Sequence, residues 1–113
     1  MAYCHCRDCR RWTGAPVAAF AAFEATGLDI PGVDRSHAPG VRRWHCEACG
    51  SPLAAQFDYL VGQVYVPVGI FDQADLLQPA LHSHADSALP WLHIADALPR
   101  AETPARDVLK AAQ

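Results

Sequence analysis

The sequence predicts a small, mainly β protein in which short antiparallel strands surround two clusters of cysteines. Three observations support this fold class. The apolar runs are short, and most end at glycine or proline turns, as strands do. The run at 64–68 is rich in β-branched residues, which favour strands. All five cysteines lie in two clusters, which are expected to pin the modest core of a 113-residue chain.

The expected elements follow the apolar runs in order. Residues 1–3 leave no room for a leading strand, so the first cysteine cluster is expected to begin the fold. The apolar run at 17–23 follows Pro16 and precedes a Thr-Gly pair, which favours a buried strand over a helix. Pro67 cannot donate to a strand ladder, which indicates an edge or a bulge. The expected strands are 17–23, 41–45, 53–57, 64–68 and 81–84, with a loop over 28–40, a turn or short helical piece over 88–96, and a loose helix or no order over 105–112.

Composition and charge indicate one globular domain, residues 1–113, and exclude several classes of protein. Apolar residues make up 51%, which argues against disorder. No apolar run approaches the roughly 20 residues that span a bilayer, so no membrane association is expected. A net charge of −3 with a single lysine argues against nucleic-acid binding. Without a targeting segment, the reducing cytoplasm is the expected location.

The first cluster places Cys4, Cys6 and Cys9 within six residues. Thiolates this close repel each other unless a cation lies between them, and Zn²⁺ takes thiolate sulfur at about 2.3 Å. A disulfide is the alternative, but an odd number of cysteines would leave one thiol unpaired, and adjacent Cys-x-Cys bridges are strained. Cys46 and Cys49 form a second, Cys-x-x-Cys turn that Gly50 closes, which is typical of a zinc knuckle.

Arginines surround both clusters. Arg7, Arg10 and Arg11 border the first cluster, and Arg42 and Arg43 lead into the second. Guanidinium groups beside thiolates lower the thiol pKa and attract anionic small molecules. Alternatively, these arginines only offset thiolate charge or lie in solvent.

The histidines and tryptophans give weaker signals. In an extended segment His5 points away from its cysteine neighbours, which makes it a supporting or surface group rather than a ligand. His82 and His84 would share one strand face and can reach one metal, but half-exposed strand residues are the simpler interpretation. Spacing suggests no partner for His45 or His93. The simplest interpretation of the three tryptophans is a place in the core or at its rim: Trp12, Trp44 and Trp91.

The two cysteine motifs together resemble the signature of the glutathione-dependent formaldehyde-activating enzyme family, which also includes centromere protein V. The resemblance implies the Mss-four-like fold, in which zinc pins twisted antiparallel sheets. It also implies carbon–sulfur lyase chemistry on an adduct of glutathione and formaldehyde. The likeness covers nearly the whole chain and is carried by CHCRDCRRWTGAP at 4–16, RWHCEACGSPL at 43–53, VGIFD at 68–72, Pro79 with His82, and residues 91–99.

By that resemblance, Cys4, Cys6 and Cys9 match the three thiolates of the family's catalytic zinc, and Cys46 with Cys49 matches half of its structural zinc site. The family places a further Cys-x-Cys pair upstream, whereas this sequence starts three residues before the first cysteine. The expectations are a longer gene product, loss of the structural zinc, or one closed four-cysteine site that leaves Cys9 over.

Two functions follow as expectations. In the first, a three-cysteine zinc keeps its fourth position for a substrate thiol, and the protein acts on a thiol–aldehyde adduct with a small thiol such as glutathione as partner. Arg10, Arg11 and Arg43 are then the candidates to hold the substrate's carboxylates. In the second function, four cysteines close the zinc site to substrates, and the protein is a non-catalytic zinc-binding module with a structural or interaction role. An exposed sheet edge in a domain short of two strands makes a homodimer possible.

Overall fold

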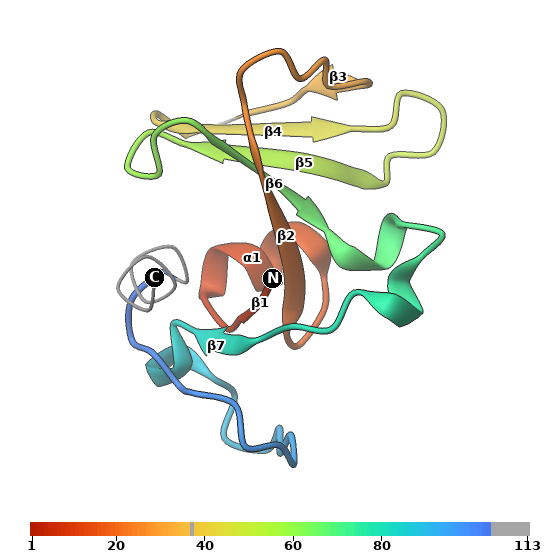
Figure 1. Cartoon of the computed structure of the whole chain (residues 1–113). Helices are drawn as coiled ribbons and strands as arrows, with labels where there is room; N and C mark the ends of the chain where they lie inside the picture. Colours follow the sequence, from red (N-terminus) through yellow and green to blue (C-terminus); the bar gives the residue numbers. More distant parts are fainter. Residues whose placement is uncertain (37, 105–113) are drawn as a thin grey trace. The chain divides into compact units, whose positions relative to one another are not determined.

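The computed structural model describes residues 1–36 and 38–104, in which the chain is mainly β with little helix. The strands are hydrogen-bonded in the order β3-β4-β5-β6-β2-β1-β7, which gives one mixed sheet (Figure 1). The segment 105–112, expected to be a loose helix or without order, lies outside the described residues. The elements are β1 Ala2–Cys4, α1 Arg7–Thr13, β2 Ala18–Glu24, β3 Val33–Asp34, β4 Val41–His45, β5 Pro52–Phe57, β6 Gln63–Pro67, β7 Leu81–Ser83, and the 3₁₀ turns η1 Val68–Ile70, η2 Ala74–Leu76 and η3 Ala85–Ser87.

The chain forms two compact units. The first unit combines Met1–Phe20 with the chain from Gln73 onward, and the second unit is Ala21–Asp72. The single domain over residues 1–113 therefore stays a prediction.

The first unit contains a leading strand that the sequence analysis did not expect. Strand β1 is only three residues long, but it pairs antiparallel with β2 and parallel with β7, where Tyr3 lies opposite His82. Pairing on both sides lets so short a strand form, so the prediction of no strand at 1–3 is wrong. The parallel β1–β7 pair also makes the sheet mixed rather than purely antiparallel.

Helix α1 follows β1 after two residues. Its N-cap is Cys6, whose sulfur accepts a hydrogen bond from the backbone N–H of Cys9 at 3.3 Å, so a thiol takes the place of the usual hydroxyl or carboxylate cap. The helix ends at Gly14, which adopts a left-handed φ of 74° that glycine accepts without strain. This helix of about two turns returns Cys9 toward Cys4 and Cys6.

The second unit holds an antiparallel arrangement of β3, β4, β5 and β6. Its core is built on Trp44, Ala54 and Val64, with Trp44 opposite Ala54 in the β4–β5 register. A small alanine leaves room for the large indole that lies opposite it in this register. The predicted strands at 41–45, 53–57 and 64–68 are confirmed to within one residue, and so is the strand at 17–23, which appears as β2.

Two local predictions in this unit are wrong. The expected loop at 28–40 contains the short strand β3. Strand β6 lies between β5 and β2, so the edge position predicted for Pro67 is wrong, and the alternative of a bulge stays a prediction. Pro67 instead ends the strand, where η1 begins and no further ladder N–H is needed.

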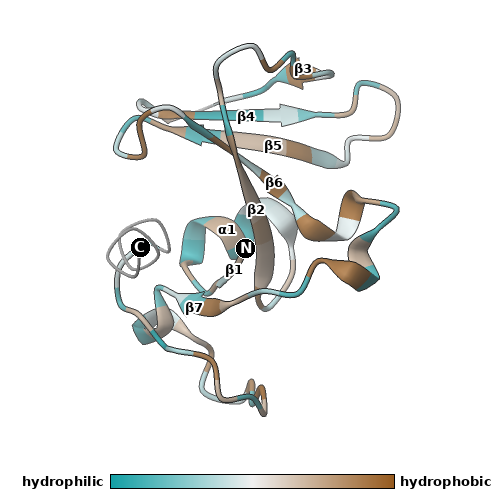
Figure 2. Ribbon diagram, viewed as in Figure 1, coloured by the Kyte–Doolittle hydropathy of each residue, from teal (hydrophilic) through white to brown (hydrophobic). Residues whose placement is uncertain are grey.

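Hydropathy follows this architecture. Hydrophobic residues mark β6 and the segment after it, whereas part of α1 is hydrophilic (Figure 2). Trp44 is buried and Trp12 half-buried, but Trp91 is 63% exposed, so its expected place in the core or at its rim is wrong. No helix in the described part of the chain is both long and apolar enough to cross a membrane.

Candidate metal centre

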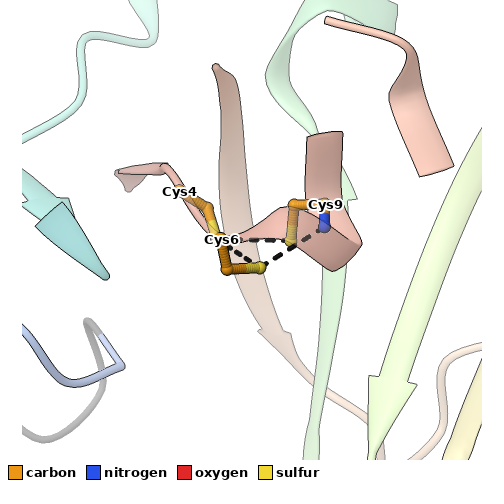
Figure 3. Close-up of side chains that lie close together, drawn as sticks. All are labelled: Cys4, Cys6 and Cys9. Carbon is orange, nitrogen blue, oxygen red and sulfur yellow. Dashed lines mark hydrogen bonds between the residues drawn. The ribbon is translucent and has the colours of Figure 1, made fainter. Parts of the chain in front are cut away.

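Three thiols meet where β1 passes into α1. Cys4 is the last residue of β1, Cys6 is the N-cap of α1, and Cys9 lies in the first turn of α1. The Sγ atom of Cys4 lies 3.4 Å from that of Cys6 and 3.2 Å from that of Cys9, and all three sulfurs are within 4.8 Å of one another (Figure 3). Cys4 and Cys9 are buried and Cys6 is half-buried, so the cluster keeps one more accessible side.

These sulfurs fit a metal ion. With zinc–sulfur bonds of about 2.3 Å, tetrahedral geometry separates the ligand sulfurs by about 3.8 Å, close to the spacing in this cluster. The cysteines of the chain are free thiols rather than disulfides. A set of three soft sulfur donors favours zinc over calcium or magnesium, which take oxygen ligands.

Hydrogen bonding inside the cluster shows why a cation would be needed to ionise all three thiols. Hydrogen bonds from Cys4 and then Cys9 lower the pKa of Cys6 to about 2. The hydrogen bond with Cys6 raises the pKa of Cys4 to about 11, and the hydrogen bond with Cys4, with burial, raises the pKa of Cys9. Without a cation these contacts therefore favour ionisation of Cys6 and oppose ionisation of Cys4 and Cys9.

The second cysteine motif forms the expected turn. The N–H of Gly50 donates to the carbonyl of Cys46 at 2.8 Å, and Gly50 takes a φ of 78°. Cys49 is exposed, and its hydrogen bond with Ser51 at 3.1 Å lowers its pKa. Among described residues 21–36 and 38–72, no third histidine, cysteine or carboxylate gathers with these two thiols. A metal at Cys46 and Cys49, in a site of their own or in a closed four-cysteine site, stays a prediction.

Comparison with known proteins agrees with the cysteine geometry. The model of one protein family, described as glutathione-dependent formaldehyde-activating enzyme, matches residues 1–87. The chain belongs to this family. No curated protein matches the sequence. The family match covers both cysteine motifs and β7 of this formaldehyde-activating enzyme family member. It ends before the segment at 88–104.

The histidines of this family member lie differently from the prediction. His5 is 5% exposed and stands outside the sulfur cluster, as expected of a supporting group. His82 is 1% exposed rather than half-exposed, because chain segments cover β7 on both sides. Strand β1 pairs with β7 on one side, and on the other the backbone N–H of His82 donates to the carbonyl of Pro99. His84 lies beyond the end of β7 at a φ of 50°, so the shared strand face of His82 and His84 is wrong.

Hydrogen bonds join the two buried histidines to a carboxylate. His5 Nε2 lies 2.7 Å from His82 Nδ1, and His82 Nε2 lies 2.9 Å from Asp96 Oδ2. Arg100 donates to the other carboxylate oxygen at 2.5 Å. The hydrogen bond with His82 lowers the pKa of Asp96 to about 2, so the carboxylate is ionised at neutral pH. We refer to His5, His82 and Asp96 together as the histidine chain.

Two of the three predicted arginines come together. Arg10 and Arg11 line a shallow pocket in the first unit, whereas Arg43 belongs to the second unit, where its guanidinium carbon lies 5.8 Å from the ring centre of Phe57. Arg10 donates to the carbonyls of His5 at 3.2 Å and Ser87 at 2.5 Å, so it has a structural role. Arg7 was not among the predicted carboxylate-binding arginines, although spacings of three and four residues along a helix place Arg7, Arg10 and Arg11 on one face. The pocket is lined by Arg7, Arg10, Arg11, Gly14, Ala15, Pro16 and Leu89.

Proposed function

We propose that the protein is a zinc-dependent enzyme of the carbon–sulfur lyase type that acts on the adduct of a small thiol, such as glutathione, with an aldehyde such as formaldehyde. The observation that carries this proposal is the gathering of Cys4, Cys6 and Cys9 with no fourth protein ligand among the described residues of the first unit. Three thiolate ligands leave one position of a tetrahedral zinc for a substrate. A zinc bound there would lower the pKa of the substrate thiol and supply Lewis acidity.

The side chains around the cluster support a thiol that carries carboxylates. Arg7 and Arg11 are exposed on α1, the helix that also carries Cys9, and both line the shallow pocket. Their guanidinium groups can bind the carboxylates of glutathione through charge-assisted hydrogen bonds. Arg10, which is held by two backbone carbonyls, shapes this pocket and adds positive charge to it. The free cysteines fit a reducing compartment, which supports a cytoplasmic location.

The reaction is tested by measuring how fast glutathione, formaldehyde and their adduct exchange, using magnetization-transfer NMR. The zinc-loaded chain is expected to accelerate exchange over buffer, and the Cys9→Ser variant is expected not to. Cys49→Ser is the matched control, because it removes a thiol outside the cluster and should keep the acceleration. Exchange at the buffer rate by a fully zinc-loaded chain would refute the lyase and leave a non-catalytic zinc module.

Replacing Arg11 with glutamine is expected to weaken glutathione binding about three- to tenfold, the size of one lost charge-assisted hydrogen bond at an exposed site. Isothermal titration of the zinc-loaded chain measures this change. Binding of 2-mercaptoethanol, a thiol with no carboxylate, should stay the same.

Arg42→Gln is the control for net charge, because Arg42 is an exposed arginine of the second unit that pairs with Asp34 at 3.2 Å. Equal losses of glutathione affinity in Arg11→Gln and Arg42→Gln would contradict a carboxylate site at the pocket.

A further inference from the structure

The segment that follows the family-matched residues runs along β7. Ala101 N–H donates to the carbonyl of His82 at 2.8 Å, and Ala85 N–H donates to the carbonyl of Ala101 at 2.8 Å. His82 and Arg100 form a parallel bridge. This segment therefore covers the side of β7 that β1 leaves open, and it carries Asp96 and Arg100 to the buried ring of His82.

The contacts of the histidine chain define which ring nitrogens carry hydrogen. The ionised carboxylate of Asp96 can only accept, so His82 donates through Nε2–H. A neutral His82 then has its lone pair on Nδ1. The 2.7 Å contact with that atom requires His5 to donate through Nε2–H. His5 Nδ1 is left with a lone pair, and it is buried with no hydrogen-bond partner among the described residues.

The ring of His5 is tied to the backbone that carries two of the candidate ligands. His5 stands between Cys4 and Cys6, and its N–H donates to the carbonyl of Ser83 at 3.1 Å. The ring stacks on His82 with 5.0 Å between centroids, and Tyr3 stacks on His82 at 4.7 Å. His82 is thus packed against the side chains of both Tyr3 and His5, one on each side of Cys4 in the sequence.

We propose that Asp96 is a positioning residue for the candidate metal centre: it holds His82 and His5 in their Nε2-protonated tautomers and so fixes the segment from which Cys4 and Cys6 project. The inference rests on the proposed binding of zinc by the cysteine cluster. If the carboxylate is removed, His82 can protonate on Nδ1 instead and donate to His5 Nε2. The hydrogen of His5 must then move to Nδ1, where a buried N–H has no acceptor among the described residues.

The test uses the full chain, with and without zinc, at a pH where both rings are neutral. Long-range ¹H–¹⁵N NMR assigns the protonated nitrogen of each ring, and competition with a chromophoric chelator gives the zinc affinity. The wild-type chain is expected to show His5 and His82 protonated on Nε2. Asp96→Ala is expected to shift both rings toward the Nδ1–H tautomer and to lower zinc affinity about tenfold, the usual loss for an outer-shell partner.

Asp96→Asn is the conservative rescue, because the amide oxygen can still accept from His82 Nε2–H; it should restore both the tautomers and the affinity. Asp86→Ala, which removes an exposed aspartate of the same unit, should change neither. A wild-type His5 protonated on Nδ1 would overturn the inference without any variant. Wild-type zinc affinity in a folded Asp96→Ala chain would also overturn it. Neither readout uses a substrate thiol or an aldehyde, so failure of the proposed reaction is distinguishable from failure of this inference.

Discussion

Replacing Cys9 with serine is expected to lower the zinc affinity of the chain by more than about 100-fold, because even outer-shell partners of metal ligands cost about 10- to 100-fold when they are lost. Cys9 is buried and its sulfur lies 3.2 Å from that of Cys4, so serine would leave two thiolates and a poorly matched hydroxyl at the centre. Chelator competition measures the affinity, and circular dichroism checks that the strands persist.

The comparison with Cys49→Ser separates the two arrangements of ligands. If zinc is held by Cys4, Cys6 and Cys9, the cluster affinity falls in Cys9→Ser and persists in Cys49→Ser. If Cys4 and Cys6 instead share a closed site with Cys46 and Cys49, the pattern reverses. The reversed pattern would contradict the open, three-cysteine centre on which the proposed function depends.

Replacing Gly32 with alanine is expected to destabilise the fold by about 3 kcal/mol or more, through left-handed backbone strain together with overpacking. Gly32 has a φ of 92°, and a Cβ there would meet the carbonyl oxygen of His45 and lie 2.8 Å from Cδ1 of Leu53. A backbone carbonyl cannot move aside as a flexible side chain can. His45 precedes Cys46, so the same substitution should also disturb the second cysteine motif.

Gly27→Ala is the matched control for this prediction. Gly27 has a φ of 75° but nothing within 4 Å of the added Cβ, so only the strain of about 1 kcal/mol remains. Urea unfolding of the zinc-loaded variants measures both losses of unfolding free energy. Equal losses at the two positions would show that the close approach of Gly32 to β4 and β5 does not matter.

The strands were predictable wherever the signal was local. Apolar runs bounded by turn residues placed β2, β4, β5 and β6 to within about one residue, because burial and turn chemistry both act over short distances. Strand β1 was not predictable in this way. It exists because residues 81–83 pair with it from far along the chain, and no local pattern encodes such a partner. Helix α1 was missed because its cap is a cysteine sulfur rather than a residue usually preferred there.

In the candidate site, too, the residues were predictable only where the pattern that indicates them is local in the sequence. Three cysteines within six residues can only present their sulfurs to one small volume, so spacing alone brought Cys4, Cys6 and Cys9 together. The burial of His82 and its contact with Asp96 depend on a segment that packs on β7, so alternation along the strand indicated a half-exposed residue instead. The exposure of Trp91 was missed for a related reason, since composition does not show which apolar residues a fold leaves outside.

The proposed function requires that Cys4, Cys6 and Cys9 hold a zinc ion that also accepts a substrate thiol. The most direct test is an anomalous difference map at the zinc edge, on crystals of this chain soaked with glutathione. We expect a peak bound by these three sulfurs, with the glutathione sulfur as the fourth ligand. A peak enclosed by Cys4, Cys6, Cys46 and Cys49, with glutathione unbound, would contradict it.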